Sequence, residues 1–246
     1  MFHFGFPWGI FFKFRALSAI TAISFGTTGC RKHEGELFYM ITWLHPDRRI
    51  VLASGSPRRK ELLRNIGVTF EVICGEHFDE SAYIAESDLE GSLCRLALAK
   101  GKSPADSNPD ALVLSADTIV VCGNSVLGKP TDRADAESML HLLSGKAHRV
   151  MTAVSLVCRE MSFASSRCVT TAVHFRNLTE GEIQGYLDTD EAWDKAGAYG
   201  IQGRAMVFVE KIEGCFYNVV GLPISGTIDL FKAFDARKDH HNVARN

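Results

Sequence analysis

A short basic segment, SGSPRR at residues 54–59, follows an apolar run at residues 50–53. Pro57 suits the first turn of a helix, so the loop before it would leave free backbone N–H groups at the positive end of the helix dipole. Arg58 and Arg59 would add forked, permanently charged donors for phosphate oxygens. Arginines oppose the dipole in that turn, and a bound anion would relieve the conflict. The segment predicts phosphate binding; a capped helix with a solvated basic turn is the alternative.

An acidic residue, Asp117, interrupts the otherwise apolar run at residues 112–121. A carboxylate inside such a strand is costly unless it is paired, protonated or bound to a metal. Next to phosphate groups it could hold Mg²⁺ or activate a water molecule. A carboxylate that caps a neighbouring loop is the alternative.

Two lysines and a glycine-rich loop are further candidates. Lys100 continues the stripe of Leu89, Leu93 and Leu96, and Lys129 lies in a short GKP loop. Lysines of this kind often only extend along the surface, but two that converge on a basic loop would suit a triphosphate.

The loop DKAGAYGIQG at residues 194–203 contains three glycines that would let the backbone approach a ligand closely. Its Gln202 offers both a donor and an acceptor, which suits the edge of a nucleobase. An ordinary tight turn is equally compatible with the local pattern.

The elements that would position these residues alternate between strands and helices, which indicates an α/β fold with a mixed sheet and flanking helices. We expect a hairpin of residues 205–212 and 216–220, and a helix that Thr179 and Glu182 start as a capping box. The remaining strands are expected at residues 50–53, 68–74, 112–121, 150–158 and 168–175. The remaining helices are expected from Pro57 to Gly67, at residues 88–100 and 132–143, and from Pro223 to about Phe234.

Composition restricts the classes of function. The 246 residues include 27 basic and 29 acidic ones, for a formal net charge of −2, so no uniformly positive field would hold a long nucleic acid. Seven scattered cysteines form no C-x-x-C pair, which argues against a disulfide framework and a zinc site. Mostly buried thiols in a reducing, cytoplasmic compartment are expected, with neither nucleic acid nor membrane as a partner.

The first 39 residues differ from the rest, since they are rich in Phe, Ile and Ala. The apolar stretch at residues 16–25 has the length of a signal-peptide core and is short for a membrane span. A targeting leader and a folded extension are alternatives. We favour a dispensable extension, with Met40 as a natural start and residues 40–246 as the functional domain.

Taken together, the segments resemble the Maf family, also called septum-formation-inhibitor-like proteins. The matching stretches, in the family's order, are LASGSPRRKELL (52–63), SADTIV (115–120), GKP (128–130), LSGK (143–146), MTAV (151–154), DKAGAYGIQG (194–203) and VGLPI (220–224). The resemblance covers residues 50–234. It implies a fold like that of the inosine triphosphate pyrophosphatases, with an elongated sheet and a cleft between two lobes. It also implies hydrolysis of a nucleoside triphosphate to the monophosphate and pyrophosphate with Mg²⁺ or Mn²⁺, and homodimers are common in the family.

Roles for individual residues follow from the resemblance. Asp117 matches the general base, and Arg58, Thr118 and Gln202 match the positions that determine specificity. The branch that acts on methylated GTP typically has Trp, Gln and Glu there, whereas Arg, Thr and Gln match the branch that acts on dTTP and UTP. Ser56, Arg59, Lys100 and Lys129 match polar residues of the cleft, and Glu80 with Asp117 matches the metal ligands.

Two other functions remain as alternatives. The first is hydrolysis of methylated GTP or other modified nucleotides. The second is a regulator of cell division that senses nucleotides without turnover. A general base would be of no use to a pure sensor, so Asp117 favours an enzyme.

Overall fold

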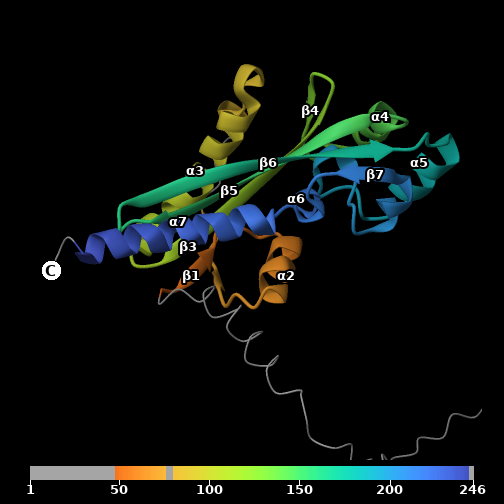
Figure 1. The fold of residues 1–246 in the computed structure, drawn as a ribbon. Coiled ribbons are helices and arrows are strands. Elements are labelled where there is room, and N and C mark those ends of the chain that lie inside the picture. Colours follow the sequence, from red (N-terminus) through yellow and green to blue (C-terminus); the bar gives the residue numbers. More distant parts are fainter. Residues whose placement is uncertain (1–47, 76–79, 244–246) are drawn as a thin grey trace, which may run out of the picture.

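The computed structural model describes residues 48–75 and 80–243, and a mixed β-sheet forms the centre of these residues (Figure 1). The sheet has seven strands in the order β2-β1-β3-β5-β6-β7, and β4 pairs with β3 beside this path. The strands are β1 (Ile50–Leu52), β2 (Glu71–Val72), β3 (Leu112–Cys122), β4 (Ser125–Leu127), β5 (Ala147–Cys158), β6 (Phe163–Phe175) and β7 (Val209–Glu213). The predicted mixed sheet with flanking helices is confirmed.

Helices cover both faces of the sheet. The α-helices are α2 (Pro57–Asn65), α3 (Leu89–Ser107), α4 (Arg133–Leu143), α5 (Glu180–Leu187), α6 (Phe216–Val220) and α7 (Ile224–Val243). Short 3₁₀ helices are η1 (Ser81–Tyr83), η2 (Glu86–Asp88), η3 (Ala196–Ala198) and η4 (Arg204–Phe208). The predicted capping box of α5 is present, since Thr179 and Glu182 bond to each other's backbone N–H. These bonds satisfy donors that a helix start otherwise leaves free.

Alternate residues of β3 belong to different hydrophobic layers, because successive side chains of a strand point to opposite faces. Ile119 and Val121 pack with the α3 residues Leu93 and Leu96. The even-numbered residues other than Thr118 pack in the main core with residues of α2, α4 and α7. Helix α3 therefore covers one face, and α2, α4 and α7 pack on the opposite face. Figure 1 shows α3 and α7 on opposite sides of the sheet.

One edge of β3 changes neighbours along its length. Strand β1 pairs in parallel with residues 112–114, and β4 pairs antiparallel with residues 120–122. Strand β5 occupies the other edge along residues 113–121. Between β1 and β4, residues 115–119 have no strand neighbour on their side within the described chain. This open stretch of edge contains Asp117 and Thr118.

Several predicted elements need correction. The expected hairpin of residues 205–212 and 216–220 is wrong: residues 204–208 are a 3₁₀ helix, β7 pairs with β6, and Phe216–Val220 is helix α6. A run of β-branched and aromatic residues fits a strand locally, but here packing against β5 and β6 selects the helix. The strand expected at residues 68–74 shrinks to β2. Helix α3 continues to Ser107 through Pro104, and β4 was not predicted.

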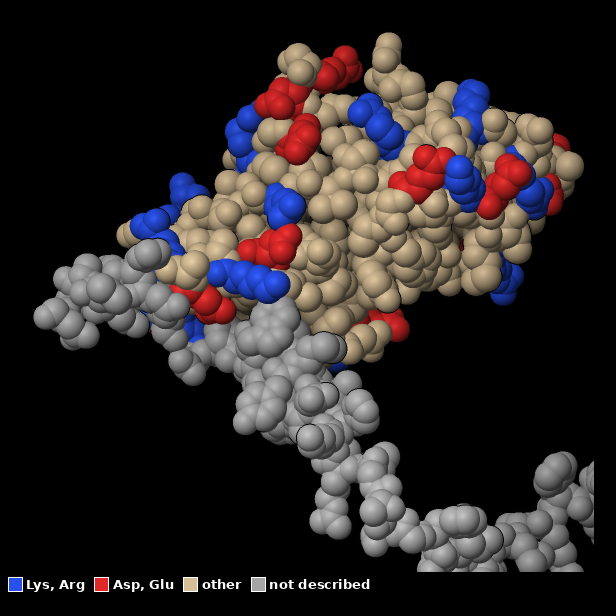
Figure 2. Space-filling view, in the orientation of Figure 1, with Lys and Arg blue, Asp and Glu red and all other residues tan. Residues whose placement is uncertain are grey.

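Cysteines and surface charge complete the fold. All cysteines of the described residues are free thiols, but the prediction that most are buried is wrong, because only Cys122 and Cys158 are fully buried. Lys, Arg, Asp and Glu side chains are interspersed on the face seen in Figure 2. Among the described helices, none combines the length and the apolar character needed to cross a bilayer. The 1–39 extension and Met40 lie outside the described residues.

Candidate active site

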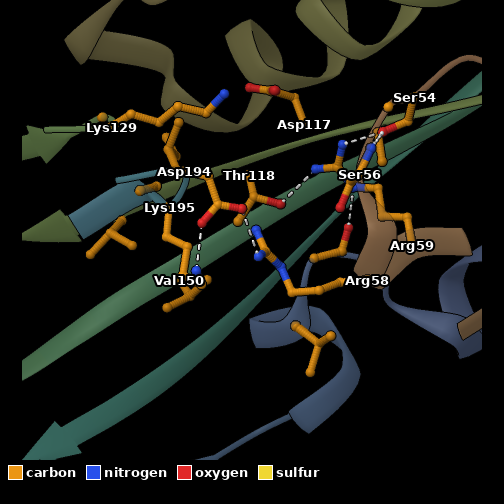
Figure 3. Close-up of a pocket in the computed structure, with 18 of the residues that line it drawn as sticks. Ser54, Ser56, Arg58, Arg59, Asp117, Thr118, Lys129, Val150, Asp194 and Lys195 are labelled. Atoms are coloured by element: carbon orange, nitrogen blue, oxygen red, sulfur yellow. Dashed lines mark hydrogen bonds and ion pairs between the residues drawn. The ribbon is translucent and has the colours of Figure 1, made fainter. Parts of the chain in front are cut away.

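A cavity of about 860 Å³ opens along the unpaired stretch of the β3 edge. Loop residues 53–56, the start of α2, one side of α3 and the glycine-rich loop after Asp194 surround it, so the cavity joins segments far apart in the sequence (Figure 3). All site residues predicted from the sequence line it: Ser56, Arg58, Arg59, Glu80, Lys100, Asp117, Thr118, Lys129 and Gln202. The tertiary structure therefore brings the complete predicted set together.

The balance of charge in the cavity favours an anion. Its basic lining residues are Arg58, Arg59, Lys100, Lys129 and Lys195, and its acidic ones are Glu80, Asp117 and Asp194. Five positive and three negative groups give a formal balance of +2 in a chain whose net charge is −2. A small polyanion fits this local excess better than a long nucleic acid does.

Helix α2 starts at the cavity as the sequence predicts. Pro57 is in its first turn, no acidic residue lies there, and Ser56 makes no side-chain cap. The first N–H groups of α2 thus have no side-chain cap, which leaves the positive end of the helix dipole for an anion.

Arg59 is fixed by three hydrogen bonds from three different segments. Its Nε donates to Gly221 O at 2.7 Å, Nη1 to Ser54 Oγ at 3.1 Å, and Nη2 to Thr118 Oγ1 at 3.1 Å. Burial lowers the pKa of this guanidinium, while the charge of Asp117 opposes the change. A guanidinium has five N–H groups, so two of them are left for a ligand in the cavity.

Arg58 has a partner that the sequence did not reveal. Its Nη1 lies 3.1 Å from Asp194 Oδ2, with 28% of the Arg58 side chain and 58% of the Asp194 side chain exposed. Burial raises the pKa of Asp194, but its hydrogen bond to Lys195 and the charge of Arg58 outweigh burial and hold the pKa below its usual value. Part of the negative charge expected from a ligand at this helix start therefore comes from the protein.

Asp117 points away from Arg59, toward α3. Its carboxylate forms an ion pair with Lys100, whose Nζ also lies 3.0 Å from Glu80 Oε1. The side chains of Asp117 and Lys100 are only 13% and 19% exposed, so this pair is shielded from solvent. The prediction that Lys100 follows the apolar stripe of α3 inward is confirmed by this contact.

Asp117 and Glu80 form a donor set that fits a divalent cation. Both carboxylates converge on one positive group, the ammonium of Lys100, at the wall of the cavity. Mg²⁺ is commonly held by one or two carboxylates together with substrate phosphates, and two carboxylates beside an anion pocket match that pattern. The cluster of Glu137, His141 and Glu180 on α4 and α5 is separate, since none of the three lines the cavity.

Lys129 and Gln202 line the cavity from two glycine-containing loops. A backbone hydrogen bond connects these loops, since Gly197 N–H donates to Gly128 O at 2.9 Å. Both side chains are exposed, and Lys129 has no ion-pair partner among the residues that the structure describes. An unpaired ammonium at a cavity wall remains able to contact a phosphate group.

The sequence assigned no individual role to four lining residues of the segments that it singled out: Ser54, Asp194, Lys195 and Tyr199. Asp194 and Lys195 belong to the glycine-rich loop that was singled out, but no local signal connects Asp194 with Arg58, which is 136 positions earlier. Tyr199 is 5% exposed, and its hydroxyl lies 2.8 Å from His148 Nε2. Only the fold brings Asp194 beside Arg58.

Comparisons with known proteins match most of the chain. The family model described as "Maf-like protein" matches residues 49–234. A dTTP/UTP pyrophosphatase of Bacillus anthracis (strain CDC 684 / NRRL 3495) is 46% identical over 194 residues, which cover 78% of this chain and 99% of the relative. A dTTP/UTP pyrophosphatase of Bacillus cereus (strain ATCC 10987 / NRS 248) is 45% identical over 194 residues, 78% of this chain and 93% of the relative.

Proposed function

Since the chain belongs to the family of Maf-like proteins, we propose that it hydrolyses dTTP and UTP to the nucleoside monophosphate and pyrophosphate. The observation that carries the proposal is the single cavity that gathers every predicted site residue around an excess of positive charge. The family model covers residues 49–234, which include the whole lining of this cavity, and the relatives are named as pyrophosphatases with these substrates.

Water attacks the α-phosphorus, and the bond from this phosphorus to the oxygen that bridges it to the β-phosphorus breaks. Asp117 orients the water and accepts its proton, since it is the acidic residue in the cavity that lies on the β3 edge. Pyrophosphate leaves with the bridging oxygen. Arg59, Lys100 and Lys129 neutralise the charge that develops on this leaving group.

The nucleobase is selected by Arg58, Thr118 and Gln202, as the resemblance to the dTTP/UTP branch implies. Thr118 and Asp117 are adjacent in β3, so their side chains point to opposite faces of the sheet and approach the open edge from two sides. A substrate that straddles this edge would expose its phosphates to Asp117 and Lys100 and its base to Thr118. The Asp194 partner of Arg58 balances charge on the base side.

Asp117 and Glu80 would hold Mg²⁺ or Mn²⁺, which would shield the phosphate charge from the attacking water. We further propose that the enzyme is cytoplasmic, that it can form homodimers, and that residues 40–246 are the catalytic domain. Its six described cysteines are free thiols, and this agrees with a reducing compartment.

The decisive experiment measures pyrophosphate release by the full chain. The substrates are dTTP, UTP, CTP, GTP and methylated GTP, each with Mg²⁺ and with Mn²⁺, and chromatography identifies the monophosphate product. Preference for dTTP and UTP is expected. Preference for methylated GTP would contradict the assignment of Arg58, Thr118 and Gln202 while it preserves the enzyme class. Nucleotide binding without turnover would favour a sensor.

The role of Asp117 is tested by Asp117→Asn in the same assay. We expect kcat to fall by at least about 10²-fold, the usual contribution of a general base. Asp190→Asn is the matched control, because Asp190 is an exposed carboxylate that does not line the cavity. Near-normal turnover by Asp117→Asn would refute the assignment of the base.

A further inference from the structure

Behind Thr118, a chain of hydrogen bonds leads into the protein interior. Thr118 Oγ1 lies 2.9 Å from Thr152 Oγ1 on the neighbouring strand β5, where the two residues are register partners. Thr152 Oγ1 donates to the backbone carbonyl of Asn218 in α6 at 2.9 Å. Thr152 and Asn218 are completely buried, and neither lines the cavity. The family roles discussed above involve neither of these residues.

Only one direction of each hydrogen bond in this chain places a proton in every short contact between two oxygens, although Asn218 O also accepts from Gly221 N–H at 3.0 Å. A carbonyl only accepts, so the single hydroxyl proton of Thr152 is committed to Asn218 O. The bond between the two threonines must then use the proton of Thr118. If Thr152 donated to Thr118 instead, the oxygens Thr152 Oγ1 and Asn218 O would face each other at 2.9 Å without a proton between them. In a buried site that arrangement costs free energy.

Thr118 also receives a hydrogen bond that cannot be reversed. Arg59 Nη2 donates to Thr118 Oγ1 at 3.1 Å, and a guanidinium has no acceptor (Figure 3). The hydroxyl of Thr118 therefore donates inward to Thr152, accepts from Arg59, and has one lone pair left. Toward the cavity it can act as an acceptor only.

We propose that Thr152 and the Asn218 carbonyl are positioning groups that make Thr118 a one-way acceptor for the N3–H of a uracil or thymine base. The inference rests on the proposed function and deepens it. The imide of uracil and thymine presents a donor at N3, whereas cytosine presents an acceptor there. A hydroxyl that cannot rotate its proton into the cavity accepts from N3–H of uracil or thymine, and it repels the lone pair at N3 of cytosine.

Two features of the site agree with a base at this position. Gly221 lines the cavity without a side chain, and a Cβ there would lie 3.5 Å from Thr118 Oγ1. The absence of a Cβ atom at Gly221 leaves room for a base beside the Thr118 hydroxyl. The neighbouring Arg58 is paired with Asp194, which offsets part of the positive charge on this side of the cavity.

The test compares Thr152→Val with Thr152→Ser in the full chain. Valine has nearly the shape of threonine but can neither donate nor accept a hydrogen bond, so the hydroxyl of Thr118 becomes free to donate into the cavity. We expect the ratio of kcat/KM for UTP to that for CTP to fall about three- to tenfold, the net worth of one hydrogen bond. Serine keeps the hydroxyl and should keep the ratio close to that of the wild type.

Because both substrates are measured on one preparation, a loss of folded protein cancels in the ratio. An unchanged ratio in Thr152→Val, with the wild-type enzyme active on UTP, would refute the positioning role of Thr152 and leave the proposed function intact. Lack of UTP turnover by the wild type would instead remove the proposed function itself.

A second measurement does not depend on the Thr152 variants. Competition by 3-methyl-UTP, which carries a methyl group in place of the N3 proton, should be at least about tenfold weaker than competition by UTP in the wild type. Thr118→Ala, which opens space at this position, should recover much of that loss. Equal competition by both nucleotides in the wild type would show that N3 does not face Thr118.

Discussion

His148 is a buried histidine whose charge the folded protein disfavours, and its removal should change how stability depends on pH. The residue is 2% exposed on β5, its ring packs edge-on against Phe175 and Tyr199, and Nε2 lies 2.8 Å from Tyr199 Oη. Burial lowers the pKa of His148 to about 4, and the nearby His174 adds to the effect, although the backbone of Lys146 opposes it.

The size and sign of the effect follow from this pKa. In the unfolded chain the histidine has an ordinary pKa of about 6.5, so that state binds the proton first as the pH falls. Stability is therefore complete above about pH 6.5 and declines as the pH falls toward 4. One pKa unit corresponds to about 1.36 kcal/mol, so His148 should remove about 2 kcal/mol by pH 5 and roughly 3 kcal/mol below pH 4.

The assay is urea denaturation followed by circular dichroism at pH 7.5, 6 and 5, for the wild type and His148→Gln. Glutamine is neutral throughout and can still bond to Tyr199. Between pH 7.5 and 5 the stability of His148→Gln should therefore fall by about 2 kcal/mol less than that of the wild type. His141→Gln is the control, because His141 is exposed on α4 and its ion pairs there are worth less than about 1 kcal/mol. Parallel pH profiles for the wild type and His148→Gln would refute the reasoning.

Two further predictions concern local structure, and urea denaturation at neutral pH checks both. Gly197→Ala should destabilise the fold by about 1–3 kcal/mol, because Gly197 has φ +71° and a Cβ there would lie 3.1 Å from Val120 Cγ1. Gly185→Ala is its control: Gly185 is inside α5 with open space around it, so alanine should be neutral or stabilising, and equal losses in both variants would contradict the argument. Thr179→Ala should cost about 0.5–2 kcal/mol through loss of the α5 cap, whereas exposed Thr69→Ala should change little; a loss no larger than that of Thr69→Ala would refute the importance of the capping box.

Local signals in the sequence were sufficient for most of the fold. The apolar run of β3, the proline that starts α2 and the capping box of α5 each act within a few residues, so their effect can be recognised without knowledge of the rest of the chain. The same is true of the types of chemistry. Arg58 and Arg59 at a helix start indicate phosphate binding, and Asp117 in an apolar strand indicates a carboxylate that is paired, protonated or bound to a metal.

Long-range packing decided what those signals left open. The segment Phe216–Val220 has the composition of a strand, yet it is a helix, because it packs against β5 and β6 and places the Asn218 carbonyl behind Thr152. The gap between β1 and β4, which leaves Asp117 and Thr118 without a strand neighbour on that edge, depends on where two other strands end.

Side-chain partners in the site were equally beyond local inference. Arg58 pairs with Asp194 across 136 positions, and the direction of the Thr118 hydroxyl is set by groups on β5 and α6. Residue types and their order along the chain determined which chemistry this protein could perform. The partner, orientation and burial of each group were decided by the tertiary structure, because hydrogen-bond direction and charge balance depend on neighbours in space.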